Sequence, residues 1–376
     1  MKEYTDKDVL RLAKRVNNTK RTFLLVNPLQ AKHIPVRPSV SLEMMKTLGQ
    51  KLAAKYPDTR LIVGFAETAT AIGAAVASCF PGDCLYMHTT REALPQVKDW
   101  ILFQEEHSHA TEQKLAAEGF LKGLNQTGTV LFIEDEISTG RTLRNMICQL
   151  RELVPEGSHV QMVAASIINR MSEANENLLR ESGIVCECLV RVPEEDYSAQ
   201  LEHCAVECAA SLEREDENAS AVEALSAQAG YPDPRLTVSM SDYSESLRRI
   251  TESAAGQISG RIPAGARLLV LGTEECMYPA LVLGEAMEEH CGGHVFCHST
   301  TRSPIGIKND QDYPIRNGHR MNSLYQDGRN THLYNFAAYD AAVVVSDAGD
   351  NADRGLAELA HALTAHGTSK IFFLKL

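Results

Sequence analysis

The chain has 376 residues and a formal net charge of −12, with 44% hydrophobic and 23% charged residues. This composition is that of an ordinary globular protein and excludes fibrous and intrinsically disordered classes. At about 150 residues per domain, the length predicts two or three domains. The acidic balance argues against a nucleic-acid partner, which would need a basic surface to neutralise phosphates. Since no apolar run reaches the roughly 18 residues of a membrane helix, we expect a cytoplasmic protein without a membrane partner.

Strand-length apolar runs alternate with helical patterns along the first half of the chain. The runs fall at residues 22–27, 60–65, 83–88, 129–135, 160–168 and 183–191. Helical periodicity lies between them, as in residues 41–56 and 140–153. Continuous apolar strands that alternate with helices are typical of a parallel sheet covered on both faces. The first half is therefore predicted to be a doubly wound α/β domain.

A change of composition predicts the domain boundaries. Residues 211–235 are acidic, rich in alanine and serine, and end in Pro232 and Pro234, a pattern typical of a linker. Beyond it the alternation resumes, with strands predicted at 266–272, 294–300 and 341–347. We therefore expect a first domain at 1–212, an acidic linker at 213–235 and a second α/β domain with a doubly wound parallel sheet at 236–376.

Similar segments follow one another in the same order in both halves. Arg91 precedes Asp135 by 135 − 91 = 44 residues, and Arg302 precedes Asp347 by 347 − 302 = 45 residues. Short look-alikes arise by chance, but ordered matches with near-equal spacing favour duplication. The second domain is therefore predicted to be a diverged repeat of the first.

The segment "FIEDEISTGRT", residues 132–142, carries the main chemical signal. A strand that enters a short loop and then a helix presents backbone N–H groups and the positive end of the helix dipole. The loop Ser138-Thr139-Gly140-Arg141-Thr142 suits a monophosphate, since glycine permits close backbone approach and hydroxyl groups donate to phosphate oxygens. The alternative is an ordinary helix cap.

Three acids precede this loop. Glu134 and Asp135 could accept hydrogen bonds from ribose hydroxyl groups and hold Mg²⁺, directly or through water. A ribose 5-phosphate binder is the interpretation that accounts for both the acids and the loop.

The segment resembles the phosphoribosyl pyrophosphate (PRPP) signature of type I phosphoribosyltransferases, in which a strand runs into two acids and a Thr-Gly-x-Thr loop. The resemblance implies a Mg²⁺-dependent enzyme that transfers ribose 5-phosphate from PRPP to a nitrogen acceptor and releases pyrophosphate. It assigns Glu134 and Asp135 to ribose and metal, whereas Glu136 takes a position that is usually apolar. A PRPP-binding regulator without turnover is the alternative. We also expect a homodimer.

The same resemblance predicts the surroundings of the signature. Its pyrophosphate loop corresponds to Glu67, Thr68, Ala69 and Thr70. Arg91, after the next strand, would meet pyrophosphate oxygens or be a surface arginine. Residues 103–115 take the position of the family's mobile lid, where His107 or His109 would assist proton transfer or be solvated loop histidines. A lid favours the enzyme over the regulator, because closure excludes water from a reaction.

The acceptor pocket of the family lies in segments outside the core sheet. Residues 27–39 and the strand near 183–191 are the candidates here. Lys32, His33 and Arg37 would meet an anionic acceptor or be ordinary loop charges.

The tetrapeptide Thr301-Arg302-Ser303-Pro304 resembles the TRSP domain, which follows a phosphoribosyltransferase-like domain in gene neighbourhoods associated with tellurite resistance. This resemblance implies biosynthesis of a nucleotide-like metabolite. The second half keeps Asp347 but has "AGDNADRG" in place of the hydroxyl loop, and these acids would repel a phosphate. Thr301, Arg302, Ser303 and Asp347 form its candidate site, with Arg302 as an anion ligand.

Overall fold

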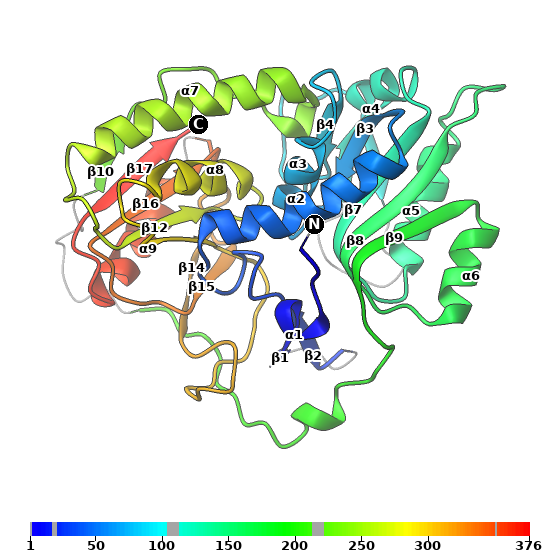
Figure 1. Cartoon of the computed structure of the whole chain (residues 1–376). Coiled ribbons are helices and arrows are strands. Elements are labelled where there is room, and N and C mark those ends of the chain that lie inside the picture. Colours follow the sequence, from blue (N-terminus) through cyan, green and yellow to red (C-terminus); the bar gives the residue numbers. More distant parts are fainter. Residues whose placement is uncertain (1, 17–20, 104–112, 213–221, 350–351) are drawn as a thin grey trace. The chain divides into compact units, whose positions relative to one another are not determined.

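The computed structural model describes the chain except residues 1, 17–20, 104–112, 213–221 and 350–351. Its contacts divide the chain into two compact units (Figure 1). The first unit contains residues 1–6, 43–195 and 231–246, and the second contains residues 7–42, 196–230 and 247–376. The units are interleaved, so they do not follow the predicted boundaries of 1–212, 213–235 and 236–376. Among the described residues, no helix is both long enough and apolar enough to span a membrane.

The first unit is built on a six-stranded sheet in the order β11-β4-β3-β7-β8-β9. Its strands are parallel except for β11, which pairs antiparallel with β4. The strands are β3 (Thr59–Gly64), β4 (Leu85–His88), β7 (Thr129–Ile137), β8 (Gln161–Asn169), β9 (Ile184–Arg191) and β11 (Val238–Ser239). The other elements assigned wholly to this unit are α3 (Thr70–Ala77), α4 (Ala117–Leu124), α5 (Arg141–Arg151), α6 (Glu173–Glu181), the 3₁₀ helix η2 (Pro234–Leu236) and the hairpin of β5 (Trp100–Phe103) and β6 (Gln113–Ala116).

Both faces of this sheet are buried, which explains the continuous apolar runs. Leu61 and Val63 of β3 join a core cluster with residues of α4, α5 and the hairpin. Ile62 between them is fully buried outside that cluster, and α3 contacts β3, β4 and β7. Small residues bring α3 close to the sheet, since a Cβ atom on Gly73 would lie 3.1 Å from Gly64 Cα. The predicted doubly wound α/β fold is confirmed.

The second unit contains a five-stranded, all-parallel sheet in the order β10-β17-β16-β12-β13. Its strands are β10 (Val222–Leu225), β12 (Leu268–Gly272), β13 (Val295–Ser299), β16 (Ala341–Ser346) and β17 (Ile371–Lys375). It also contains α8 (Tyr278–Met287), α9 (Asp353–Ala365), η1 (Ala199–Leu201), the hairpin of β1 (Arg11–Lys14) and β2 (Phe23–Val26), and the hairpin of β14 (Gly318–Asn322) and β15 (Asn330–Tyr334). Three helices include residues of both units: α1 (Asp6–Val9), α2 (Pro38–Lys55) and α7 (Met240–Ser259).

Two segments differ from their predicted roles. The run at 22–27 does not join the parallel sheet of the first unit, because β2 pairs antiparallel with β1 and packs in the second unit against Ile305 and Ile315. The predicted linker at 213–235 contains β10, which pairs in parallel with β17. The composition did not predict β10, because a short strand among polar residues resembles a linker. It did not predict the partner of β2, because an apolar run does not show which strand it pairs with.

The two units share one plan, as the repeated segments predict. The strand order β4-β3-β7-β8 of the first corresponds to β13-β12-β16-β17 of the second. Helix α3 follows β3 as α8 follows β12, and the β5–β6 hairpin follows β4 as the β14–β15 hairpin follows β13. Helix α5 follows β7 as α9 follows β16. In each unit, the hairpin and the last of these helices pack in one core cluster on the sheet.

Candidate active site

The signature lies where β7 ends and α5 begins. The strand extends through all three acids to Ile137, and α5 starts at Arg141. Gly140 caps the helix with φ of 68°, a left-handed conformation that favours glycine. A Cβ atom there would lie 2.7 Å from Met171 Sδ, so space as well as conformation requires glycine. Ser138 is half-buried and Thr139, Arg141 and Thr142 are exposed, which leaves their side chains accessible to a phosphate.

Burial and neighbouring charges raise the pKa of Glu134 and of Asp135. Burial, followed by the charge of Asp135, raises the pKa of Glu134 well above its ordinary value. Burial, followed by the charge of Glu136, raises the pKa of Asp135 to about 6. The positive charge of Arg91 opposes the rise in the pKa of Glu134. Clustered carboxylates of this kind favour a cation or hydroxyl donors beside them.

Glu136 has a separate partner. Its Oε1 lies 3.9 Å from Nε of Arg170, and both side chains are about nine-tenths buried. Arg170 also donates through Nη2 to the carbonyl oxygen of Glu195 at 3.0 Å. Glu136 is therefore part of a buried ion pair at the end of the sheet, which explains an acid where the family pattern is apolar.

The predicted pyrophosphate loop meets the signature. The peptide bond between Ala66 and Glu67 is cis, Glu67 is buried, and Ala69 caps the helix that starts at Thr70. The hydroxyl of Thr68 hydrogen-bonds to the carboxylate of Asp135 and favours its charged form. Loops after two neighbouring parallel strands therefore converge, as expected for the carboxyl edge of a parallel sheet.

Thr89, which the sequence did not indicate, holds this loop in place through hydrogen bonds. Thr89 is fully buried, and its Oγ1 accepts a hydrogen bond from the backbone N–H of Ala66 at 2.8 Å. The same hydroxyl donates to Oε1 of Gln113 at 2.7 Å. Gln113 is the first residue of β6, so Thr89 links the loop before α3 to the end of the hairpin where Phe103 pairs with Gln113. The repeated "TTR" at 89–91 and 300–302 was the signal available in the sequence.

The predicted lid coincides with the β5–β6 hairpin. The two strands flank residues 104–112, and Thr90 pairs with Lys114, the second residue of β6. His107 and His109, named as possible proton carriers, lie outside the described residues. Arg91 follows directly on Thr90 and is half-buried.

The carboxylates of the signature are the candidate ligands for a Mg²⁺ ion. Among the residues that the structure describes, no group of three or more His, Cys, Asp or Glu side chains could hold a metal alone. Glu134 and Asp135 are oxygen ligands whose mutual repulsion a cation would relieve. They fit Mg²⁺ in its usual mode, with one or two carboxylates and the remaining positions filled by water and substrate phosphates.

The second unit repeats the hydrogen bonds of this site. Thr89 N donates to Gly64 O at 2.9 Å, and Thr300 N donates to Gly272 O at 3.1 Å. The hydroxyl of Thr300 accepts from the N–H of Glu274 at 3.0 Å, as that of Thr89 does from Ala66. Thr301 pairs with His332 as Thr90 pairs with Lys114. The repeat predicted from segment order is present at the level of single bonds.

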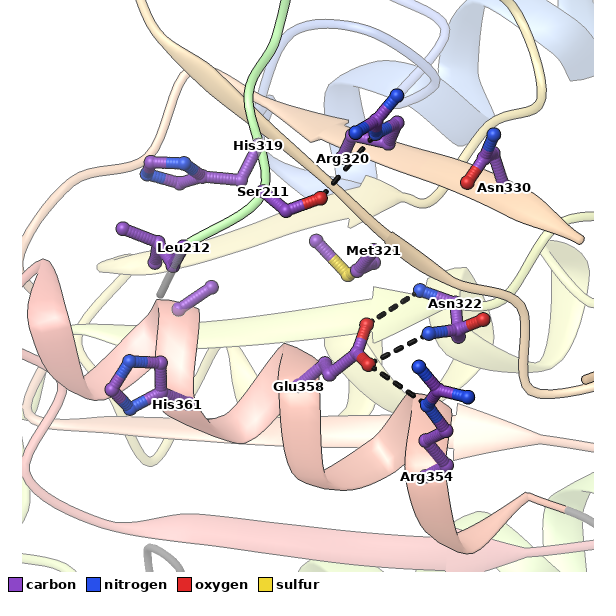
Figure 2. A pocket seen from close by; sticks show the side chains of 11 residues that line it. Ser211, Leu212, His319, Arg320, Met321, Asn322, Asn330, Arg354, Glu358 and His361 are labelled. Atoms are coloured by element: carbon purple, nitrogen blue, oxygen red, sulfur yellow. Dashed lines mark hydrogen bonds and ion pairs between the residues drawn. The ribbon is translucent and has the colours of Figure 1, made fainter. Parts of the chain in front are cut away.

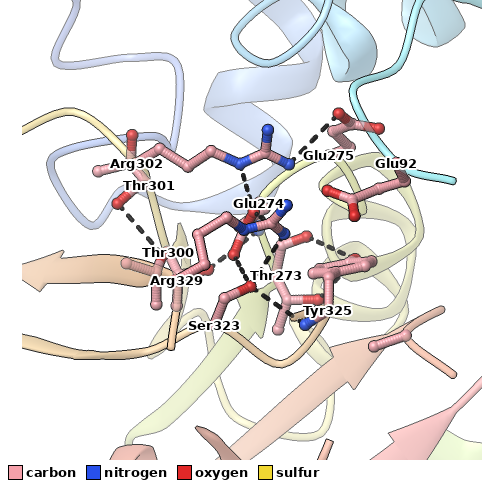
Figure 3. Close-up of polar contacts among 12 residues, drawn as sticks. Glu92, Thr273, Glu274, Glu275, Thr300, Thr301, Arg302, Ser323, Tyr325 and Arg329 are labelled. Atoms are coloured by element: carbon pink, nitrogen blue, oxygen red, sulfur yellow. Dashed lines mark hydrogen bonds and ion pairs between the residues drawn. The ribbon is translucent and has the colours of Figure 1, made fainter. Parts of the chain in front are cut away.

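Two of the four predicted residues of the second unit, Arg302 and Asp347, belong to one polar network, part of which Figure 3 shows. Arg302 Nε donates to Glu274 Oε2 at 2.5 Å, and Ser323 Oγ donates to Glu274 Oε1 at 2.5 Å. The N–H of Tyr325 donates to Ser323 Oγ, and the Tyr325 hydroxyl donates to Asp347 Oδ1 at 2.5 Å. Arg302 and Asp347 are thus connected through residues that the sequence did not indicate. The hydroxyl of Thr301 accepts from the N–H of Ser303, which shapes the turn.

The candidate acceptor residues of segment 27–39 are held within the second unit. Lys32 is fully buried and donates through Nζ to the carbonyl oxygens of Glu274 and Thr300, at 3.0 Å each. It is therefore a structural cation and not a loop surface charge. His33 is buried, and Arg37 Nη2 lies 3.5 Å from Glu288 Oε2.

A separate groove of about 320 Å³ lies between β14 and α9 (Figure 2). The carboxylate of Glu358 in it accepts two hydrogen bonds from Asn322, at 2.7 Å each, and one from Arg354 at 3.2 Å. None of the predicted site residues lines this groove.

Two family profiles match the chain, one after the other along the sequence. The family profile described as phosphoribosyl transferase matches residues 9–193, and the profile described as TRSP domain matches residues 235–363. No curated protein matches the chain.

Solved structures similar to the chain include three adenine phosphoribosyltransferases. The Trypanosoma brucei enzyme, in complex with AMP, pyrophosphate and ribose-5-phosphate, is 14% identical, with 49% of this chain and 76% of that chain covered and a TM-score of 0.33. The Leishmania tarentolae enzyme is 15% identical, with 50% of this chain and 85% of that chain covered and a TM-score of 0.33. The Giardia lamblia enzyme, in complex with 9-deazaadenine, is 14% identical, with 49% of this chain and 93% of that chain covered and a TM-score of 0.34.

Proposed function

The chain belongs to the phosphoribosyl transferase family through residues 9–193 and carries a TRSP domain at 235–363, and from this premise we propose that it transfers ribose 5-phosphate from PRPP to a nitrogen acceptor. In this reaction the bond from ribose C1 to the pyrophosphate oxygen breaks, the bond from C1 to nitrogen forms, and the acceptor loses a proton. The observation that carries the proposal is the meeting of the loop after β3 with the signature, through the hydrogen bond from Thr68 to Asp135, beside a helix N-terminus capped by Gly140.

Each part of the site has a role in this proposal. The loop from Ser138 to Thr142 holds the 5-phosphate with the N-terminus of α5, which has a positive dipole end. Glu134 and Asp135 accept hydrogen bonds from the ribose hydroxyl groups. Arg91 and the loop from Glu67 to Thr70 hold the pyrophosphate. The positive charge of Arg91 offsets the negative charge that develops on the pyrophosphate as it departs.

Mg²⁺ is the cofactor of this proposal, and Glu134 and Asp135 would hold it. When bound, it neutralises charge on the phosphate oxygens. Arg91 supplies a fixed positive charge, and the loop from Ser138 to Thr142, the phosphate cradle of this proposal, fixes the ribose relative to the acceptor. His107 remains the proposed proton carrier of the lid.

The setting of the reaction is also part of the proposal. The resemblance to the fused architecture favours a cytoplasmic homodimer that makes a nucleotide-like metabolite, in a pathway linked to tellurite resistance. The acceptor would be a small molecule that presents a nucleophilic nitrogen.

Pyrophosphate release from PRPP, with a panel of nucleobases and small amines, tests the activity. We expect release that depends on Mg²⁺, and a loss of about tenfold or more in PRPP affinity for Asp135→Asn, which removes a charged acceptor. Tight PRPP binding without release under any acceptor would favour the regulator. Normal PRPP binding by Asp135→Asn would refute the site.

Two glycines offer a matched test of the cradle. Gly140→Ala forces a side chain into a left-handed position against Met171, whereas Gly157→Ala meets the same conformational problem, at φ of 83°, with nothing within 4 Å. Both should lose about 1 kcal/mol or more of stability, and only Gly140→Ala should lose PRPP binding. Equal PRPP affinity in both variants would exclude the loop as the phosphate cradle.

A further inference from the structure

Residue equivalence between the units follows from strand register. Gly64 pairs with Ile133 in the first unit, and Gly272 pairs with Val345 in the second. Counting onward from these pairs, Ala66 corresponds to Glu274 and Asp135 corresponds to Asp347. The repeated threonine bonds make Arg91 correspond to Arg302. At the position of a small alanine, the second unit therefore has a carboxylate beside the equivalent arginine.

The carboxylate of Glu274 occupies a set of anion donors. Its Oε2 accepts from Arg302 Nε at 2.5 Å and from Arg329 Nη2 at 3.0 Å, and its Oε1 accepts from Ser323 Oγ at 2.5 Å. The Glu274 side chain is 1% exposed, whereas those of Arg302 and Arg329 are 15% and 19% exposed. Two guanidinium groups and a hydroxyl that converge on one oxyanion are the donors that proteins use for phosphate.

The backbone is adapted to this arrangement. Glu274 has φ of 47°, a conformation that L side chains rarely adopt. Its N–H donates to Thr300 Oγ1, and its carbonyl oxygen accepts from the buried ammonium of Lys32. The loop is therefore fixed at both peptide groups while its side chain points into the donors (Figure 3).

We infer that the second unit retains a site for a phosphate-type oxyanion at Arg302, Arg329 and Ser323, and that the chain fills this site with its own Glu274 carboxylate. An external anion binds there only when Glu274 no longer supplies its charge. The inference rests on the proposed function for the comparison with Arg91, while the donor geometry stands without it. Arg302 is accordingly an anion ligand, as its sequence context indicates, but its anion is internal.

Calorimetric titration of the full chain with pyrophosphate tests this inference. All variants carry Arg91→Met, which removes the pyrophosphate contact proposed for the first unit. In this background we expect no binding, and Glu274→Gln should create one site with a gain of about tenfold or more, the value of a charged hydrogen bond. Adding Arg302→Met to Glu274→Gln should abolish the gain.

Glu275→Gln is the matched control. Glu275 is also buried next to Arg302, but its Oε1 lies 3.5 Å from Arg302 Nη2, and this substitution should create no site. A gain of binding in this control, no gain in folded Glu274→Gln, or Arg302-dependent binding in the chain that keeps Glu274 would overturn the inference. If Glu274→Gln lowers the melting temperature of the chain, pyrophosphate should raise it again, and the lack of any rise would also overturn the inference.

The test separates this inference from the proposed function. If the first unit binds no pyrophosphate, wild-type chain and Arg91→Met will bind equally poorly. The gain caused by Glu274→Gln, and its loss with Arg302→Met, would still be measurable.

Discussion

At the scale of single residues, the hydroxyl of Thr89 is the clearest determinant of the loop that precedes α3. It accepts from Ala66 N–H and donates to Gln113 Oε1, and it is fully buried. Thr89→Val keeps the shape but leaves a buried N–H without its acceptor, at a cost of about 1–3 kcal/mol. We expect the loop to shift and PRPP or pyrophosphate affinity to fall about tenfold, as measured by calorimetry.

Thr127 provides the control for this substitution. Its Oγ1 also accepts from a backbone N–H, that of Arg60 at 2.8 Å, and donates to the carbonyl oxygen of Thr129. Thr127 precedes β7, away from the carboxyl edge where the site lies. Thr127→Val should cost similar stability in urea unfolding without a change in ligand affinity. Equal affinity losses in both variants would mean that Thr89 acts only through general stability.

His298 gives the second unit a pH-dependent stability. Burial lowers its pKa from 6.5 to about 4, and the nearby ammonium of Lys32 also lowers it. Nε2 lies 2.7 Å from the carbonyl oxygen of Tyr334 and Nδ1 accepts from Ser299 N–H at 2.8 Å, so the neutral ring fits both partners. The unfolded chain binds the proton more tightly, and stability should therefore fall as the pH is lowered from 6.5 to 4, by about 3 kcal/mol.

Urea unfolding of the second unit as a function of pH checks this expectation. His298→Asn removes the titrating group and should flatten the loss between pH 6.5 and 4. His159→Asn replaces an exposed histidine and should keep the wild-type slope. An unchanged slope in His298→Asn would assign the acid sensitivity to other groups.

Candidate site residues could be named from the sequence where their chemistry is local. Gly140 and the hydroxyl residues around it form one continuous loop, so their spacing alone indicated a phosphate cradle. The partner of Glu136 could not be predicted, because Arg170 reaches it from the end of another strand. Glu274 was missed for a related reason, since its meaning depends on Arg302 and Arg329, which the fold brings together.

At the scale of elements, burial on both faces determined which strands were predictable. The central strands β3, β7, β8, β12 and β16 are long apolar runs because helices cover both sides of their sheets. Strand β10, "VEAL", lies at a sheet edge with Ala224 exposed, so it lacks that signature. The edge strands β9 and β13 were nevertheless predicted, whereas the interior strand β17 and the edge strands β10 and β11 were not.

Hydrogen exchange can distinguish β10 from the linker that its composition suggested. Its pairing with β17 protects backbone N–H groups in residues 222–225, since exchange then requires local opening. We expect this segment to exchange at least about tenfold more slowly than residues 194–196, which lie in an exposed loop. Equally fast exchange in the two segments would show that β10 does not form in solution.

At the scale of the whole molecule, the chain passes repeatedly between its two units, and this limits how it can be divided. Residues 231–246 complete the first unit, because Met240 N–H and Ser241 N–H donate to the carbonyl oxygens of Cys84 and Gly82, at 2.9 Å each. Residues 7–42 supply Leu24 and Val26 to an apolar cluster of the second unit. A cut at the predicted boundary of 212 therefore separates each segment from its partners.

Two fragments test this organisation by their unfolding. Fragment 1–212 lacks β11 and leaves the apolar side chains of β2 without their cluster, so we expect low solubility or a broad, non-cooperative transition. A fragment that joins residues 43–195 to 231–246 through a flexible linker keeps the six-stranded sheet and should unfold cooperatively in urea. Cooperative unfolding of fragment 1–212 at the same urea concentration as the joined fragment would mean that the interleaved segments add nothing to the stability of the first unit.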